Sequence, residues 1–361
     1  MRVTAVVVTY NRKELLVECL EALARQTHAL DRVIVVDNAS TDGTLETVEA
    51  SGIADRLPLD YLRVTRNGGG AEGFHYGVRA ALDADDVGEW IWLMDDDCEP
   101  ADDSLEKLLA SKAAADPATS GIAPRVHDPQ QRLLPMHRGH IVTRPVRAPI
   151  SGATAENYGT DEAEIDFFSF VGPLFRASVC REMGAPDRRY FIRFEDLEYS
   201  ARAAQRGRMW LVNDAVVVHK ENVPLLGLDP KSMWENFSRK GIFRNQWMGT
   251  YGLRNIVNSG RRYGYVTAFN AFTYVLVQLV RIALFDDHKV RTMWSYALYA
   301  YDGWRGLFRN LPPPRWAGLA DADGPVAYLN ANALRYDADV SEPVRRLTAR
   351  PTAVARATPA A

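Results

Sequence analysis

Three consecutive aspartates, Asp95 to Asp97, follow directly after the apolar run Trp90–Met94. Carboxylates about 4 Å apart repel one another by roughly 4 kcal/mol per pair at an effective dielectric constant near 20. Such a triplet therefore requires either solvation, as in an acidic turn, or a divalent cation that neutralises it. The triplet alone leaves both interpretations open.

A glycine-rich stretch, NGGGAEG, lies upstream and contains the pattern Gly68-x-Gly70-x-x-Gly73. After a strand and at the start of a helix, this pattern is typical of dinucleotide binding, with Asp95 as the downstream acid. The fingerprint normally occupies the first strand–helix turn, however, and that turn reads TYNRKE here. A helix start without a ligand and close backbone approach to another phosphate-bearing ligand remain as interpretations.

Other polar residues lie where apolar runs end. Asp37, in VVDNAST, could form an Asx turn or accept an N–H group from a nucleobase. FEDLEYS places Glu195, Asp196 and Glu198 at a helix start, where acidic residues interact favourably with the helix dipole. A carboxylate there could also serve as a general base. His219 ends the run AVVVH and gains a functional interpretation only if it meets the aspartates in space.

Apolar runs and helical patterns alternate through the first half of the chain. Thr41 or Asp42 is the expected cap of a helix that begins near Thr44. This β–α alternation predicts a mostly parallel, doubly wound α/β sheet, in which ligands bind at the carboxyl ends of the strands. The predicted strands are Val3–Val8, Arg32–Val36, Tyr61–Val64 and Trp90–Met94.

The segment after these strands has weaker patterns. We expect residues 124–164 to be loop-like and Ile165–Arg176 to form an apolar strand. The letters YFIR predict a short strand, followed by a helix from about Glu195. The stretch MWLVNDAVVVH predicts two strands around a turn at Asn213 and Asp214.

Charge divides the 361-residue chain into regions with different surfaces. Residues 1–230 hold 25 Lys and Arg against 37 Asp and Glu, whereas residues 231–310 hold 12 against 4 and contain 17 of the 36 aromatic residues. We therefore expect a first domain over 1–230, a basic, aromatic helical region over 231–310, and a partly disordered tail over 311–361. The three cysteines lie far apart, which argues against a disulfide framework or a zinc site and fits a reducing compartment.

No run reaches 18 uninterrupted apolar residues, so the sequence predicts no clear transmembrane helix. The apolar segment Tyr265–Phe285 is nevertheless flanked by basic residues on both sides. It is either an ordinary core helix or a helix that lies on a membrane surface.

The quoted motifs are individually ambiguous, but their order is informative. VVVTYNR, VVDNASTDGT, NGGGAEGF, WLMDDDCEP, FEDLEYSAR and His219 together resemble family 2 glycosyltransferases of the GT-A fold, over roughly residues 1–225. NGGGAEGF followed by the triple aspartate is most similar to bacterial galactofuranosyltransferases, with rhamnosyltransferases next. The resemblance implies a Rossmann-like sheet and an inverting, metal-dependent transfer of galactofuranose from UDP-galactofuranose. The alternatives are a dTDP-rhamnose-dependent rhamnosyltransferase, a catalytically silent nucleotide-sugar-binding protein and an NAD-dependent oxidoreductase.

The resemblance also implies roles for individual residues. Asp95, Asp97 and His219 would hold Mn²⁺ or Mg²⁺, and Asp196 matches the catalytic base. Glu72 is a departure, because the galactofuranosyl pattern often has glycine there. The residues expected to line the donor nucleotide are Thr9, Tyr10, Asn11, Asp37, Asn67, Gly69, Gly70, Asp95 and Asp96.

The implied partners are a nucleotide-sugar donor and a hydroxyl group of a polyprenyl-linked or cell-surface glycan, with no nucleic acid. The expected location is the cytoplasm, at the inner face of the cell membrane. The sequence leaves the acceptor, the linkage and the oligomeric state open.

Overall fold

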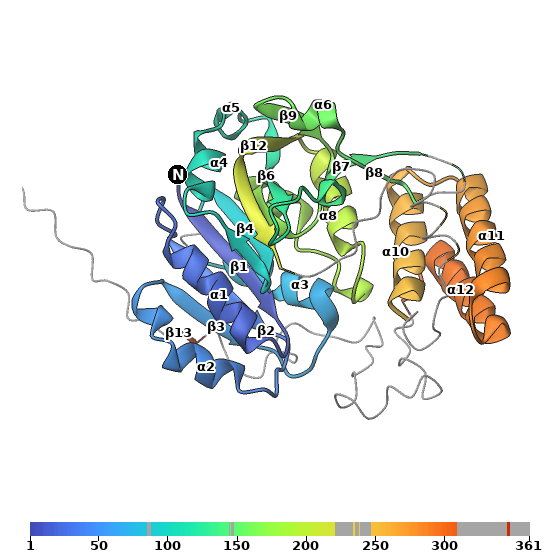
Figure 1. Cartoon of the computed structure of the whole chain (residues 1–361), viewed down its shortest axis with the longest axis horizontal. Helices are drawn as coiled ribbons and strands as arrows, with labels where there is room; N and C mark the ends of the chain where they lie inside the picture. Colours follow the sequence, from blue (N-terminus) through green and yellow to red (C-terminus); the bar gives the residue numbers. More distant parts are fainter. Residues whose placement is uncertain are drawn as a thin grey trace, which may run out of the picture.

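The computed structural model describes residues 1–84, 88–143, 145, 148–220, 234, 238, 247–308 and 345–346. A large mixed sheet lies at the centre of this part, with helices on both faces (Figure 1). Its strands run in the order β13-β3-β2-β1-β4-β11-β6-β12-β5, and β9 pairs with β12. They are β1 (Val3–Thr9), β2 (Arg32–Asp37), β3 (Leu59–Arg63), β4 (Trp90–Asp95), β5 (Cys98–Pro100), β6 (Thr119–His127), β9 (Glu162–Ile165), β11 (Val171–Arg176), β12 (Arg208–His219) and β13 (Arg345–Arg346).

Strands β3, β2, β1 and β4 are parallel, as the alternation of strands and helices predicts. Their register pairs Thr9 with Asp37, and Val8 with Asp95. The polar residues that end these strands therefore meet at one edge of the sheet. Beyond β4 the sheet becomes mixed, because β11 is antiparallel to both β4 and β6.

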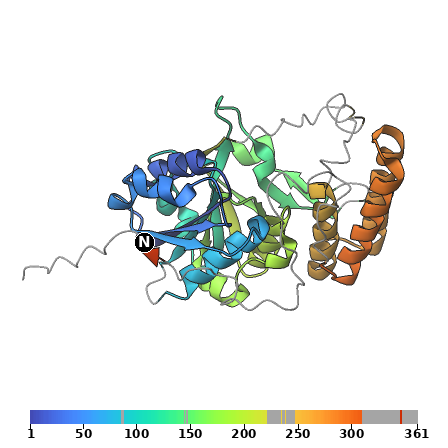
Figure 2. The same ribbon diagram turned by 90° about the horizontal axis from the view of Figure 1, so that it is seen from below.

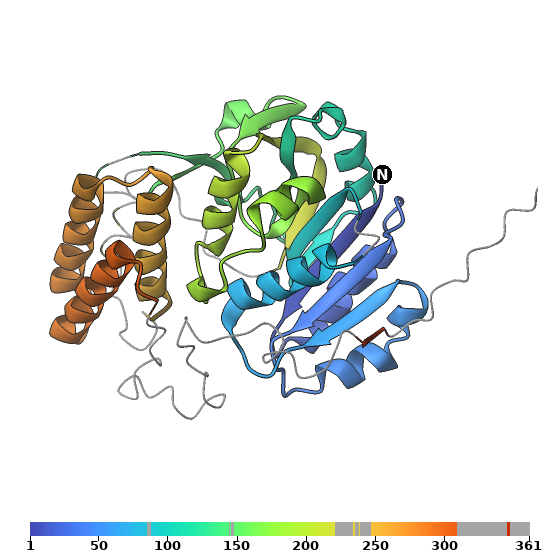
Figure 3. The same cartoon turned by 180° about the vertical axis from the view of Figure 1, so that it is seen from behind.

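Each face of β1 packs against different helices, which explains its continuous apolar sequence. Ala5 and Val7 belong to a core with α1 (Lys13–Ala24), α2 (Thr44–Ala50) and α4 (Ser104–Ala110). Val6 and Val8 belong to a second core on the opposite face of the sheet. Figure 3, the view from behind Figure 1, shows the helices on that face. The helices of that face are α3 (Gly69–Leu82), α7 (Ala177–Met183) and α8 (Glu195–Ala204).

The expectation of a loop over residues 124–164 is wrong. After β6, the chain forms β7 (Arg138–Ile141), β8 (Ile150–Gly152), α6 (Ala155–Tyr158) and β9. A small antiparallel sheet joins β7 and β8 to β10 (Phe167–Phe168), so the predicted strand over Ile165–Arg176 is divided among β9, β10 and β11. Strands β7 to β10 are only two to four residues long, which is too short for a periodic apolar pattern to be recognised.

The predicted turn at Asn213 and Asp214 is also wrong, since β12 runs through both residues. The register against β6 shifts between Val212 and Val216, which identifies a β-bulge. The side chain of Asn213 donates to the carbonyls of Asn157 and Thr160 at 2.7 and 2.8 Å, which holds the bulged strand against the loop after α6.

Two further local predictions fail. The N-cap of α2 is Gly43, with φ of 84°, and the Asp42 carboxylate instead accepts a hydrogen bond from Thr44 Oγ1 at 2.5 Å. The YFIR segment is no strand: a 3-10 turn, η3 (Arg188–Tyr190), leads through an irregular loop into α8.

Within the part of the chain that the structure describes, three named helices follow β12: α10 (Trp247–Tyr263), α11 (Ala268–Phe285) and α12 (Lys289–Arg305). They lie side by side at one end of the molecule (Figure 2) and confirm the predicted C-terminal helical region. The predicted boundary near residue 230 and the predicted disorder of the tail lie outside the described residues, apart from β13, which pairs with β3.

Candidate active site

The ends of β4 and β12 bring the aspartate triplet and His219 together. Asp95 ends β4, and the chain then turns directly into β5. The antiparallel register of β12 and β5 pairs His219 with Cys98. The imidazole consequently lies beside Asp97, with His219 Nε2 at 3.2 Å from Asp97 Oδ1.

Asp95, Asp97 and His219 have the spacing of a metal site. Each offers a ligand atom within 4.8 Å of the other two. Ligands at about 2.1 Å from Mg²⁺ or Mn²⁺, at right angles to each other, lie about 3.0 Å apart, close to the Asp97–His219 contact. Asp97 Oδ1 is also a buried acceptor without a hydrogen bond of normal geometry among the described residues. The donor set and the orphaned oxygen therefore fit a hard divalent cation.

Arg12 partly neutralises the triplet within the protein. Its Nη1 lies 3.0 Å from Asp97 Oδ2 and 3.5 Å from Asp96 Oδ1, and Thr9 Oγ1 donates to Asp96 Oδ2 at 2.7 Å. Burial raises the pKa of Asp97, but His219 and Arg12 outweigh it and leave that pKa below its ordinary value. Burial raises the pKa of Asp96 to about 6, and burial with its two neighbours raises that of Asp95. The site therefore favours an added positive charge.

Asp37 lies at the same strand edge and is fully buried. Its Oδ1 accepts from the Ser40 backbone at 2.7 Å, and its Oδ2 accepts from Tyr61 Oη at 2.8 Å. Arg63 Nε also lies 3.7 Å from Oδ2, and each carboxylate oxygen still has a lone pair for a further donor. Asn11 is nearby in the chain fold, where its Oδ1 accepts from the Thr41 backbone at 2.7 Å. Tyr10, which precedes Asn11 in the chain, is only half-buried.

The glycine-rich turn begins α3 and is built on close backbone contacts. Asn67 Oδ1 accepts from Gly69 N at 2.8 Å. Gly69 has φ of +79°, and a Cβ there would lie 2.1 Å from the carbonyl oxygen of Phe191, so no larger residue fits. A Cβ on Gly70 would lie 3.1 Å from Glu195 Oε1. The turn therefore adjoins the segment that carries the predicted base.

Glu72 is directed into the protein. Its side chain is 1% exposed, and its Oε1 lies 3.2 Å from Arg66 Nη2 and from Tyr76 Oη. Gly68 leaves the space that this carboxylate needs, since a Cβ there would lie 1.3 Å from Glu72 Oε2. The Glu72 carboxylate, which departs from the galactofuranosyl pattern, thus pairs with Arg66 inside the protein.

Glu195 and Asp196 begin α8 next to these elements. Burial and the neighbouring Asp196 raise the pKa of Glu195 to about 8. Burial raises the pKa of Asp196 to about 6, although its Oδ1 accepts from Leu197 N at 2.7 Å. Both buried carboxyls therefore take up a proton more readily than exposed ones do, and they titrate together as a pair.

Two residues at the site were not anticipated from the sequence. Arg12 lies in TYNR, and the need to offset three aspartates is the signal that could have identified it. His137 packs on His219 with ring centroids 5.0 Å apart, and its Nδ1 lies 2.8 Å from Ser169 Oγ. Burial lowers the pKa of His137 to about 3. No sequence pattern identified His137, because it lies in a segment expected to be a loop.

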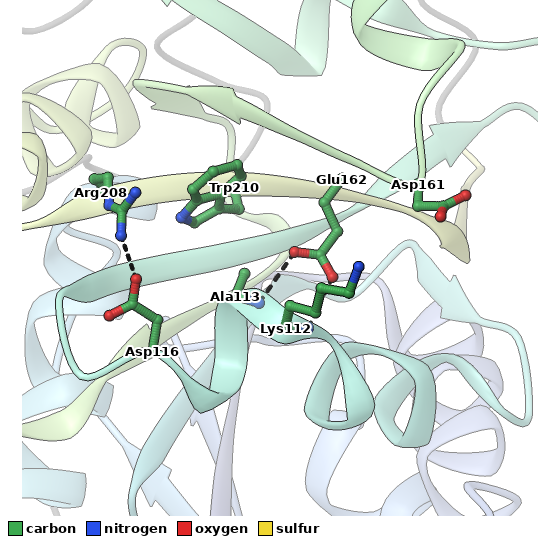
Figure 4. A pocket seen from close by; sticks show the side chains of 7 residues that line it. All are labelled: Lys112, Ala113, Asp116, Asp161, Glu162, Arg208 and Trp210. Atoms are coloured by element: carbon green, nitrogen blue, oxygen red, sulfur yellow. Dashed lines mark hydrogen bonds and ion pairs between the residues drawn. The ribbon is translucent and has the colours of Figure 1, made fainter.

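A separate hollow lies at the other end of β12 (Figure 4). It is lined by Arg208 and Trp210 at the start of β12 and by residues of α5 (Lys112–Ala115). Glu162 accepts from the backbone of Lys112 and Ala113 at 2.8 and 3.0 Å, which makes it a cap of that helix. The polar groups here serve the fold, and none belongs to the predicted site.

The sheet, its polar carboxyl edge and the adjoining glycine turn define a GT-A glycosyltransferase fold. The glycosyl transferase family 2 profile matches residues 4–184, and the chain belongs to this family. A solved structure described as GalNAc-T7 with UDP, GalNAc and Mn²⁺ has the same fold, with a TM-score of 0.57 and 16% sequence identity over 84% of this chain and 57% of that chain.

Curated relatives are glycosyltransferases as well. Galactofuranosyltransferase GlfT1 of Mycolicibacterium smegmatis is 36% identical over 208 residues, and that of Mycobacterium tuberculosis is 34% identical. The match covers 57% of this chain and just under two thirds of each relative, 66% and 65%. N-acetylglucosaminyl-diphospho-decaprenol L-rhamnosyltransferase of M. tuberculosis is 27% identical over 63% of this chain and 78% of its own length.

Proposed function

We propose that this glycosyltransferase moves galactofuranose from UDP-galactofuranose to a hydroxyl group of a lipid-linked or cell-surface glycan, with inversion at the anomeric carbon. The observation that carries the proposal is the convergence of Asp95, Asp97 and His219 at the sheet edge, next to Glu195 at the start of the helix that carries Asp196. The names of the relatives with 34% and 36% identity support the choice of sugar.

Asp196 acts as the general base. A base has to take up a proton during the reaction, and burial raises the pKa of the Asp196 carboxyl above its ordinary value, which favours that uptake. Asp196 takes the proton of the acceptor hydroxyl as that oxygen attacks the anomeric carbon from the face opposite the leaving nucleotide. No covalent bond to the enzyme forms, so the configuration inverts.

Asp95, Asp97 and His219 hold Mn²⁺ or Mg²⁺. When bound, such an ion stabilises the negative charge that develops on the departing diphosphate. Arg12 adds a second positive charge beside the same carboxylates. Asp37, Thr9, Tyr10 and Asn11 form the nucleoside side of the site, and Asn67, Gly69 and Gly70 border the donor.

The second candidate donor is dTDP-rhamnose, which the rhamnosyltransferase relative brings into consideration. Glu72 departs from the galactofuranosyl pattern, but its carboxylate is turned inward and pairs with Arg66. This orientation favours galactofuranose, because the carboxylate is directed into the protein.

The helical region brings the enzyme to the cytoplasmic face of the membrane, near its lipid-linked acceptor. By length and composition α11 could cross a membrane, and only 17% of its residues are buried. However, α11 follows α10 in the chain and leads into α12, which packs along it, and both neighbouring helices carry charged residues. A helix lying on the membrane avoids burying those charges in lipid. All side chains exposed on α11 are apolar: Ala268, Phe269, Phe272, Leu276, Val280, Ala283 and Leu284.

Turnover of a panel of nucleotide sugars with Mn²⁺ and with EDTA tests the proposal. We expect metal-dependent release of UDP from UDP-galactofuranose in the presence of a glycolipid acceptor. Faster consumption of dTDP-rhamnose would replace the donor, and binding without any turnover would indicate a silent nucleotide-sugar-binding protein.

A further inference from the structure

The loop between η3 and α8 has an unusual backbone. Phe191, Arg193 and Phe194 have φ angles of 66°, 67° and 65°, a region that side chains other than glycine seldom occupy. Such a conformation persists only where surrounding contacts determine it. The loop therefore depends on whatever binds its peptide groups.

Those contacts come from α10, about 60 residues later in the chain. Asn255 Nδ2 lies 3.0 Å from the carbonyl oxygens of Tyr190 and Ile192 and 2.7 Å from that of Arg193. Arg254 Nη2 donates to the Tyr190 carbonyl at 3.0 Å. Both side chains are fully buried, and Arg254 Nε donates to Asn255 Oδ1 at 3.0 Å, which orients the amide toward the loop.

The same loop joins the two halves of the candidate active site. On one side, the Phe191 carbonyl accepts from Ala71 N at 3.1 Å and lies against Gly69, at the start of α3. On the other side, the Phe194 carbonyl accepts from Glu198 N at 3.1 Å in the first turn of α8, which carries Asp196. The conformation of one loop thus sets the position of the predicted base relative to the glycine turn.

We infer that Asn255 is a positioning residue for sugar transfer, which acts by holding the 190–194 loop in the conformation that places Asp196 toward the donor. The inference rests on the proposed function of Asp196. It assigns part of the active-site geometry to the C-terminal helical region, which lies outside the matched family segment at residues 4–184.

Asn255→Asp tests this role with little change in shape, because a carboxylate in place of the amide lacks the donors that three carbonyl oxygens need. Asn255→Ala is the second variant, in case the carboxylate prevents folding. Ser259→Ala is the matched control: Ser259 is also buried on α10 and donates to the Asn255 carbonyl at 2.8 Å, yet its hydrogen bonds among the described residues do not include the 190–194 loop.

We expect both Asn255 variants to lose at least tenfold in kcat while the Kd for UDP with Mn²⁺ stays within threefold. Ser259→Ala should keep its kcat even if its melting temperature falls as much. Hydrogen exchange at the Ala71 amide should accelerate in the Asn255 variants only. An Asn255→Ala protein with wild-type kcat and unchanged Ala71 exchange would overturn the inference.

The exchange measurement separates this inference from the proposed function. If the wild-type protein transfers no sugar from any donor, the proposed function fails, yet faster Ala71 exchange in the Asn255 variants would still support the holding of the loop. If the wild-type protein is active and Ser259→Ala loses kcat as severely as Asn255→Ala, the role of Asn255 is general stability of α10, and the inference fails.

Discussion

Asp196 and Glu195 are adjacent carboxylates with different environments, and these environments separate their roles. We predict that Asp196→Asn retains metal-dependent UDP binding but loses about 10²–10⁴ in turnover, the usual cost of removing a general base. Steady-state kinetics with UDP-galactofuranose and isothermal titration with UDP would measure the two effects. Asp214→Asn, an exposed change on β12, is the control. Turnover of Asp196→Asn within threefold of wild type would remove Asp196 from this role.

Glu195 should limit stability at alkaline pH. Its pKa in the folded protein is about 8, above the ordinary value of 4.5 that the unfolded chain has. Between these values the folded state binds more protons than the unfolded state, so the free energy of unfolding falls as the pH rises. We predict that Glu195→Gln raises the melting temperature at pH 9 and has little effect at pH 4, measured in EDTA. Glu182→Gln, exposed on α7, should show neither effect.

At the scale of elements, the ends of β4 and β12 act as one unit. We predict that Asp97→Ala and His219→Ala each weaken Mn²⁺-dependent UDP binding by tenfold or more, because each removes one ligand of a three-residue site. Thermal shift with Mn²⁺, UDP and both together would detect the loss, with His28→Ala as a histidine control away from the site. UDP affinity that does not change on adding EDTA would contradict the site.

Helix α11 and its flanks should bind anionic membranes. Arg261 and Arg262 are exposed before α11, and Lys289 and Arg291 are exposed after it. Basic residues near an anionic surface contribute about 1 kcal/mol each, in addition to burial of the apolar face. We predict that the protein floats with anionic liposomes at low salt and that Arg261→Glu with Arg262→Glu abolishes flotation.

The control for flotation is the pair Arg181→Glu and Arg206→Glu, which makes the same change of charge on α7 and just beyond α8. This pair should float like the wild type. A wild-type protein that stays at the bottom of the gradient would indicate that the exposed face of α11 contacts protein instead of lipid.

The parallel half of the fold could be predicted because its strands are buried on both faces and therefore read as continuous apolar runs. The region from β7 to β10 could not be predicted, since its strands are only two to four residues long and too short for a periodic pattern. The same distinction holds for the site. Asp95, Asp97 and Asp37 lie at or just after strand ends, so they could be predicted as site residues. His137 and Asn255 could not, because they act through contacts between segments that are distant in the chain.

At the scale of the whole molecule, the main question is whether the sugar donor carries UDP or dTDP. Asp37 would accept the ring N–H that uracil and thymine share, so discrimination has to come from elsewhere. We propose that Asp95 accepts from the ribose 2′-hydroxyl, which dTDP lacks, and a site built around that hydroxyl would disfavour the analogue. We predict that UDP inhibits transfer at least tenfold more strongly than dTDP. Equal inhibition by both nucleotides would favour the rhamnosyltransferase alternative.

The contact between Asn255 and the 190–194 loop also has a consequence for the order in which the protein matures on the ribosome. The strands that carry the aspartates and His219 are synthesised before α10, so a nascent chain could bind a nucleotide while its predicted base is still unplaced. Activity would then begin only when the helices that we assign to the membrane have emerged, which would keep incomplete chains from consuming the donor. Ribosome-bound chains stalled before and after α10 test this hypothesis, because only the longer ones should resist proteolysis at residues 190–194.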